Sequence, residues 1–410
     1  IIYIVLALTF GYTMIVAETA IGRMTRKSPV GAFKSFGKKK WLSFGGWINA
    51  VIPVLIVPYY SVIGGWVIKY LVEYFRGNAK LLAEDGYFTD FISNGVSTEL
   101  CFVAFCAFTL IIIFAGVQNG IERVSKIMMP ILIVLSVIIA VYSVTRPGAL
   151  AGVKYFLVPN VKNFSWMTVV SAMGQMFYSL SIAMGILITF GSYMKKDTAI
   201  EDSTRNVEVF DTGIAIMAGL MIIPAVFAFS GGDPDTLQAG PSLMFITIPK
   251  VFQNMGFGTV IGIVFFLLVL FAAVTSSIAL TESAVSTFED ELGWGRKKAT
   301  VLVGVIMLVL GSLSSLGYGP LAGIKIIGMQ FLDLFDFLTN SVMMPIAALL
   351  TSLLVSRVVG IDKIEEEIIH GESAFRRKKV FVVMIKYLCP VFAIIILLSS
   401  VANALGWIKM

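Results

Sequence analysis

Ten long apolar runs restrict what this chain can fold into. Each has about 17 residues or more, the length at which a helix crosses the hydrocarbon core of a bilayer. None shows the alternation typical of a membrane barrel strand, and backbone inside lipid must form helices or a closed barrel. The sequence therefore predicts an all-α polytopic membrane protein. The runs cover residues 1–22, 43–75, 98–117, 124–145, 166–192, 206–230, 257–288, 299–315, 328–357 and 380–407.

Composition excludes an ordinary soluble protein. Of 410 residues, 58% are hydrophobic and 14% are charged, whereas a soluble domain carries about 25% charged residues. Mean hydropathy is +0.90. We expect residues 1–410 to form a single transmembrane domain. The only histidine is His370, and the three cysteines, Cys101, Cys106 and Cys389, lie inside apolar runs. The sequence therefore offers neither a disulfide framework nor a Cys/His metal site.

Basic residues concentrate in alternate loops. One set of loops, which includes residues 23–40 and 358–378, holds 21 lysines and arginines, and the other set holds about nine. Cytoplasmic loops carry such an excess, so we expect 23–40 and 358–378 to be cytoplasmic in a cell inner (plasma) membrane. Residues 76–97 and 146–165 should then lie outside. The net charge of +6 thus reflects membrane orientation and not nucleic-acid binding.

This orientation places Ile1 outside, at the start of a span. An apolar start that faces outward normally needs an earlier helix to bring the chain across, and no signal peptide precedes it. We therefore expect at least one N-terminal helix to be missing from this chain. The alternative is a complete protein whose N-terminus lies outside.

Two runs carry hydroxyl groups at their centres. Ser179 and Ser181 follow Gln175 in the fifth run, and Thr275-Ser276-Ser277 stand near the middle of the seventh. Such groups are costly in lipid unless they bind something, and hydroxyl and carbonyl oxygens suit Na⁺. The alternative is helix packing through small residues, with each hydroxyl bonded back to its own helix.

Carboxylates also occur inside or at the ends of runs. They are Glu18, Asp211, Glu282, Asp333 and Asp336. Buried acids usually mark an ion or substrate path, although Glu282, Asp333 and Asp336 could lie at wetted helix ends. Asp211 can reach the fifth run if the two helices pack together. The set contains no nucleophile–base pair and no phosphate-binding loop, so it favours binding of a small polar solute with a cation over enzymatic hydrolysis.

At these residues the chain resembles the neurotransmitter:sodium symporter family, along its whole length and in order. The segments that carry the resemblance are Glu18–Arg23, Ile52-Pro53, Tyr59-Tyr60, Gly120–Arg123 with Lys126 and Pro130, Gly174–Gly185, Ser192–Asp197, Thr275–Ala279 and Glu289–Glu291. The resemblance implies the inverted five-helix-repeat transporter fold of the leucine-transporter type, with broken helices. The ten runs would be family helices two to eleven, with the first absent. The implied activity is Na⁺-coupled symport of a small neutral or hydrophobic amino acid by alternating access.

The resemblance also implies site residues. The substrate pocket would comprise Ile56, Tyr60, Tyr178, Ser179, Ser181, Met184, Ser276 and Leu280, with the Tyr60 hydroxyl on the substrate carboxylate. Ser179 and Asp211 would belong to a first sodium site. Ala272, Thr275 and Ser276 would belong to a second, and both sites would be incomplete without the missing helix. Tyr193 and Asp290 would form an inner gate and Asp336 an outer gate, with arginine partners in the missing helix.

Four positions depart from the family pattern. Ala183-Met184-Gly185 replaces Gly-x-Gly, so an extra methyl group should reshape the pocket, and Tyr178 stands where Phe is common. Asp211 and Ala215 replace the Asn and the chloride-binding Ser of chloride-dependent relatives. A carboxylate here supplies the negative charge that chloride would bring, which predicts chloride independence. The remaining alternatives are a proton-coupled or exchanging amino-acid carrier of this architecture and a non-transporting truncated relic of the fold.

Overall fold

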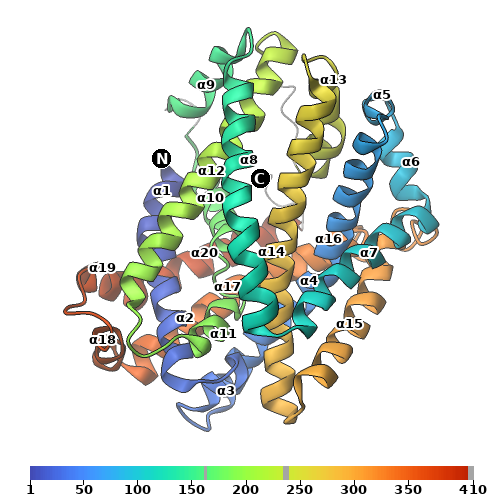
Figure 1. The fold of residues 1–410 in the computed structure, drawn as a ribbon. Helices are drawn as coiled ribbons and strands as arrows, with labels where there is room; N and C mark the ends of the chain where they lie inside the picture. The colour runs from blue at the N-terminus through green and yellow to red at the C-terminus, as the bar shows by residue number, and fades with distance from the viewer. Residues whose placement is uncertain (161–163, 234–239, 405–410) are drawn as a thin grey trace.

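The computed structural model describes residues 1–160, 164–233 and 240–404, and within them the chain forms a bundle of long helices (Figure 1). Nine helices in this part of the chain are long and apolar enough to cross a membrane. They span Ile2–Thr25, Lys40–Phe75, Gly95–Phe114, Val117–Val144, Ile200–Ser230, Gly258–Leu292, Arg296–Leu316, Phe331–Val359 and Lys378–Asn403.

Several spanning helices are built from α-helical stretches joined through short π-helical turns, and shorter helices connect them. The described α-helices are α1 (Ile2–Leu6), α2 (Tyr12–Thr25), α3 (Pro29–Lys34), α4 (Lys40–Phe75), α5 (Ala79–Leu82), α6 (Tyr87–Ser93), α7 (Gly95–Phe114), α8 (Arg123–Val144), α9 (Ala149–Leu157), α10 (Trp166–Ser179), α11 (Ile186–Tyr193), α12 (Ile200–Ser230), α13 (Ile248–Gln253), α14 (Gly258–Leu292), α15 (Arg296–Leu316), α16 (Phe331–Asp336), α17 (Met344–Leu353), α18 (Ile361–Ile369), α19 (Lys378–Val383) and α20 (Cys389–Ala404).

The predicted runs agree with this architecture, with two qualifications. Nine runs fall on the nine spanning helices, and the run over 166–192 is divided between α10 and α11. Residues 405–407 of the last run lie outside the described residues, as do residues 161–163 of the predicted outer loop. All-helical membrane architecture is therefore confirmed.

The expectation of a missing first helix is not supported. The chain already begins with a membrane-length helix over Ile2–Thr25, and its second part, α2, packs against α11 and α12. Every residue from Tyr12 to Arg23 is buried. The charge asymmetry of the loops predicts the orientation of the helices that are present. It gives no information on the number of helices, so it could not show that one is missing.

Close contacts between glycines and backbone hold α2 against α11. A Cβ atom added to Gly22 would lie 2.0 Å from the carbonyl oxygen of Ile188, and one added to Gly191 would lie 2.5 Å from that of Thr19. Without a side chain at these positions the two helices approach closely, which is how small residues support helix packing in membranes.

The long helix α4 crosses the bundle and packs against α7, α14, α15 and α17. It contains Pro53 and Pro58, which membrane helices tolerate because neighbouring groups satisfy the freed backbone atoms. Its side chains Trp66 and Tyr70 are buried against the ring of Phe245.

Loops of the two predicted sets lie at opposite ends of the bundle (Figure 1). The basic loops around α3 and α18 lie at one end, which we call the basic end. The connecting helices α5, α6, α9 and α13 lie at the opposite end. Residues 23–40 and 358–378 therefore share one face, as the alternation of charge predicts.

Candidate functional site

The helix over the fifth run is broken at its centre. α10 ends at Ser179, α11 begins at Ile186, and the six residues between them are not helical. Ser181 and Ala183 have φ angles of 54° and 58°, a left-handed conformation that costs a residue with a side chain roughly 1–2 kcal/mol. The carboxylate of Glu18 stabilises the break, because its Oε1 accepts a hydrogen bond from the Ala183 N–H at 2.8 Å.

A carboxylate cluster lies beside the break. The Ser179 hydroxyl donates to Asp211 Oδ1 at 2.7 Å, and the Tyr3 hydroxyl donates to Asp211 Oδ2 at 2.8 Å. Three helices, α1, α10 and α12, thus converge on one side chain. The structure brings together the two residues expected in the first sodium site. Sequence reasoning missed Tyr3, whose only signal was a hydroxyl-bearing ring within an otherwise apolar start.

Residues expected in both sodium sites border a single cavity of about 670 Å³ between α8, α12 and α14. Asp211 lies on its α12 wall, and Ala272, Thr275 and Ser276 lie on its α14 wall. The rest of its lining is mostly apolar and includes Leu132. A charge in such a low-dielectric setting interacts strongly with any ion nearby.

The hydroxyl of Thr275 is bonded to its own helix. It donates to the carbonyl oxygens of Ala272 at 3.0 Å and Phe271 at 3.1 Å. This is the packing arrangement that the sequence left as an alternative. It still leaves the lone pairs of the hydroxyl oxygen available to a cation.

The expected substrate residues divide into an apolar and a polar group. Ile56, Met184 and Leu280 are buried, and Ser181 lies within the break. Tyr60 on α4 and Ser276 on α14 each carry a hydroxyl group. The apolar side chains suit a hydrocarbon group, and the two hydroxyls can orient polar atoms.

Tyr59, which was not assigned a role, connects the pocket to the expected outer gate. Its hydroxyl donates to Asp336 Oδ1 at 3.1 Å, and its oxygen lies 3.5 Å from the Tyr178 hydroxyl and 3.3 Å from that of Thr339. Tyr60, the next residue of α4, points in a different direction, because neighbouring residues of a helix point about 100° apart.

The two residues expected in the inner gate have separate hydrogen-bond partners. The Tyr193 hydroxyl donates to Glu282 Oε1 at 2.7 Å, whereas Asp290 Oδ2 accepts from the Ser28 N–H at 2.5 Å. Arg296 binds both oxygens of Glu282, at 2.5 and 3.1 Å. Arg296 is thus a basic partner of Glu282, a residue that the sequence did not place in a gate. The signal that could have found it was an acid in a run followed by an arginine in the next short loop.

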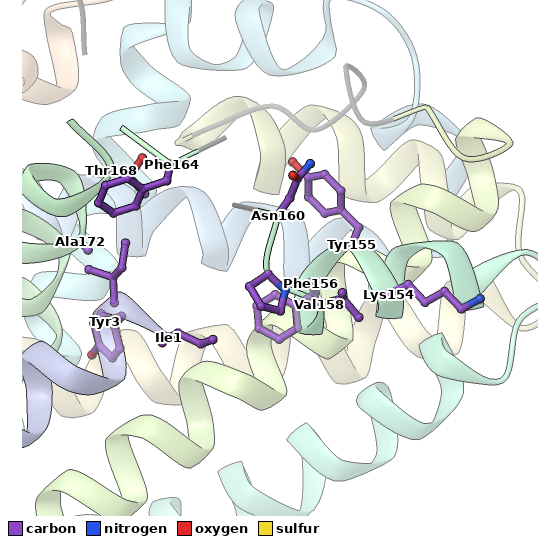
Figure 2. A pocket seen from close by; sticks show the side chains of 12 residues that line it. Ile1, Tyr3, Lys154, Tyr155, Phe156, Val158, Asn160, Phe164, Thr168 and Ala172 are labelled. Carbon is purple, nitrogen blue, oxygen red and sulfur yellow. The ribbon is translucent and has the colours of Figure 1, made fainter. Parts of the chain in front are cut away.

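A larger cavity of about 1000 Å³ lies between α1, α9 and α10 (Figure 2). Tyr3 contributes to its lining together with aromatic side chains such as Phe156 and Phe164. None of the expected substrate residues borders it. Because the hydroxyl of Tyr3 is bonded to Asp211, this cavity and the carboxylate cluster meet at one residue.

Comparison with known proteins decides the family. Residues 90–407 match the sodium:neurotransmitter symporter family. The chain is also 32% identical over 404 residues to the sodium-dependent transporter YhdH of Bacillus subtilis, across 98% of this chain and 89% of that protein. The chain belongs to the sodium:neurotransmitter symporter family. This family member is therefore a sodium-dependent membrane transporter.

Other relatives of this symporter-family chain are more distant. A sodium-dependent transporter of Methanocaldococcus jannaschii is 29% identical, with 89% of this chain and 75% of that protein covered. The sodium- and chloride-dependent GABA transporter 2 of Macaca fascicularis is 24% identical, with 89% and 67% covered.

The fold of this family member matches a solved transporter structure. The crystal structure of MhsT in complex with L-phenylalanine aligns with a TM-score of 0.86 at 32% identity, over 97% of this chain and 90% of that chain. The leucine-transporter type of fold, with a broken helix at its centre, is thereby confirmed.

Proposed function

We propose that this transporter couples the movement of Na⁺ to uptake of a neutral or hydrophobic amino acid by alternating access, without a need for chloride. The observation that carries the proposal is the Asp211 carboxylate, which is bonded by Ser179 at the helix break. It borders the same cavity as Ala272, Thr275 and Ser276. Half-helix ends and unwound backbone are the elements with which transporters of this architecture bind ions and substrates.

The substrate class follows from the lining of the proposed pocket. Buried Ile56, Met184 and Leu280 offer an apolar surface, while Tyr60 and Ser276 offer hydroxyls for the charged head group of an amino acid. MhsT, with a similar fold, was crystallised with L-phenylalanine. Ala183 carries one more methyl group than the glycine expected there, which favours a somewhat smaller side chain.

Chloride independence follows from charge balance. The Asp211 carboxylate brings a fixed negative charge to the first sodium site, and Ala215 has no hydroxyl with which to hold an anion. Changing Asp211 to Asn would leave a bound cation short of one negative charge in a poorly screened site.

Uptake by purified protein in liposomes tests the proposal. With an inward Na⁺ gradient, unmodified protein should take up phenylalanine or leucine equally in chloride and in gluconate. We expect Asp211→Asn to reduce uptake at least about tenfold in both anions, a loss of roughly 1.4 kcal/mol or more. The double variant Asp211→Asn with Ala215→Ser should recover uptake only in chloride.

A matched control is Asp90→Asn, which makes the same change on the exposed surface of α6 and should leave uptake unchanged. Normal uptake by Asp211→Asn would reject the assigned role, because it would show that transport does not need the negative charge of this side chain. Uptake driven by a proton gradient without Na⁺ would instead support the proton-coupled carrier.

A further inference from the structure

Residues 361–377 form an extended segment across the basic end of the bundle, which we call the strap. It consists of α18 and the residues that lead from it to α19. On α18, Ile364, Glu367 and Ile368 are buried and Glu366 is exposed. A buried face on a nine-residue helix shows that the strap is packed against the bundle.

The first attachment of the strap is a buried ion cluster at Glu367. Its Oε1 accepts from Arg23 Nε at 2.7 Å, and its Oε2 accepts from Lys196 Nζ at 2.6 Å. The Arg23 side chain is fully buried, and that of Glu367 is 5% exposed. Arg23 also donates to the carbonyl oxygens of Thr198 and Glu367. One carboxylate thus joins α2, α18 and the turn that follows α11.

The second attachment is at Glu201, in the first turn of α12. Its carboxylate accepts from the backbone N–H groups of Arg376 at 2.7 Å and Arg377 at 3.1 Å, and from the hydroxyl of Tyr12. Arg377 in turn binds the buried carboxylate of Glu208 at 3.1 Å. The end of the strap is therefore bonded to α12 over two helical turns.

Backbone packing between these attachments is equally close. A Cβ atom added to Gly371 would lie 2.5 Å from the carbonyl oxygen of Thr198, so the strap lies directly on the turn between α11 and α12. The same turn contributes Lys196 to the ion cluster. The turn between α11 and α12 is thus held both by an ion pair and by close backbone packing against the strap.

These attachments hold the half of the broken helix that follows the break. α11 connects to α10 only through the non-helical break at 180–185, where left-handed residues replace helical hydrogen bonding. Its other end leads directly into the turn held by the strap. The strap itself continues on one side into α17 and on the other into α19 and α20, and α17 packs against α4 and α20.

We propose that the strap is a latch: its bonds to Arg23, Lys196 and Glu201 hold α2, α12 and the turn between α11 and α12 to the α17–α20 side of the bundle, and their release permits the basic end to open. This inference rests on the proposed alternating-access function. Removing one partner of a buried ion pair is strongly unfavourable, so the bound strap favours the closed basic end.

A cysteine introduced at a buried position between α11 and α14 can report the opening of the basic end. Ser286 on α14 is 6% exposed, and its hydroxyl oxygen lies 3.4 Å from that of Thr189 on α11. In a protein whose three native cysteines are replaced by alanine, Ser286→Cys should react with a thiol reagent only when α11 moves away from α14. The labelling rate is measured without Na⁺ and without amino acid.

We expect Glu367→Gln to raise the labelling rate of this thiol about tenfold, because it breaks a buried pair. Lys196→Gln removes a half-exposed partner and should raise the rate about threefold, in line with the smaller worth of exposed pairs. Glu366→Gln makes the same change on the exposed face of α18 and should leave the rate unchanged. Size-exclusion chromatography verifies that each variant is folded.

Unchanged labelling in both Glu367→Gln and Lys196→Gln would overturn the latch. If Glu367→Gln fails to fold, Lys196→Gln alone tests the latch. The Lys196 side chain is 51% exposed, so we expect this variant to fold. The readout needs neither Na⁺ nor substrate. A protein that fails the uptake assay but shows the expected labelling pattern would reject the proposed substrate while keeping the latch.

Discussion

At the helix break, Ala183 is fully buried and adopts a φ angle of 58°. Its N–H is bonded to Glu18, so one side chain from α2 holds the residue in an unfavourable backbone conformation. Strained residues persist only where the surroundings over-determine them, and they cluster at functional sites. The methyl group of Ala183, which glycine would lack, therefore adds backbone strain at the break and should also reshape the proposed substrate pocket.

We expect Ala183→Gly to leave the free energy of unfolding within about 0.5 kcal/mol of the unmodified value. Relief of left-handed strain, roughly 1–2 kcal/mol, offsets the lost burial of a methyl group and the greater freedom of glycine in the unfolded chain. Ala284→Gly, in the buried interior of α14, lacks this relief and should lose about 1–2 kcal/mol. Thermal unfolding in detergent compares them, and equal losses would contradict the strain argument.

The Glu18 side chain offers a second test of the break. Its Oε1 accepts from Ala183 and its other oxygen, Oε2, is buried without a hydrogen-bond partner among the described residues. Glu18→Gln keeps an acceptor and should retain stability, whereas Glu18→Leu should lose about 1–3 kcal/mol because the Ala183 N–H is left unpaired. Thermal unfolding would distinguish them, and a Leu variant as stable as the Gln variant would show that this bond does not hold the break.

At the scale of elements, the contact between α2 and α11 governs how the site is assembled. Glu18 and Gly22 lie one turn apart on α2, and they meet the break and α11 respectively. The same helix continues to Arg23, which binds the strap. One helix therefore supports the break, the half-helix α11 and the proposed latch.

Gly22→Ala should destabilise the protein by about 1–3 kcal/mol, because the added methyl group overlaps the Ile188 carbonyl oxygen and forces the helices apart. Gly213→Ala is the matched control in α12. An added Cβ there meets no atom within 4 Å, so it should be neutral or stabilise the helix by up to about 1 kcal/mol. The measurement is the unfolding midpoint of each variant. A Gly22→Ala protein as stable as Gly213→Ala would refute the close crossing.

At the scale of the whole molecule, basic residues are concentrated in the loops at one end of the bundle. The loops around α3 and α18 carry the basic excess, and α5, α6, α9 and α13 lie at the opposite end (Figure 1). By the positive-inside rule we expect the basic end to face the cytoplasm. Under this orientation the latch faces the cytoplasm and its release would open the path for exit of the substrate.

Cysteine labelling on intact cells tests the orientation. In a protein without native cysteines, Glu84→Cys, on an exposed residue near α5, should react with a membrane-impermeant maleimide. Lys38→Cys, on an exposed residue before α4, should react only after the cells are permeabilised. The reverse pattern would invert the assigned orientation and place the strap outside.

The amino-acid sequence alone predicts the class of the fold and the apolar runs, and it marks the polar centre of the run in which the break lies. These depend on local properties: the length of apolar stretches, and polar or small residues such as Ser179, Ser181 and Gly185 at the centre of one of them. It also marked Asp211 as the acid that could reach the break. These features follow from the cost of polar groups and unpaired backbone in lipid, which acts on each segment separately.

Which side chains meet depends on how the helices pack in three dimensions. Mean hydropathy does not specify how far each helix is rotated about its axis or where two helices cross. A rotation of a helix by about 100°, the angle between successive residues, changes the contacts of all its side chains. That is why Tyr59 and not Tyr60 reaches Asp336, why Tyr193 meets Glu282 and not Asp290, and why Tyr3 completes the Asp211 cluster. The strap was also undetectable from sequence, because Arg23 and Glu367 are separated by 344 positions and their pairing depends on how the whole bundle closes.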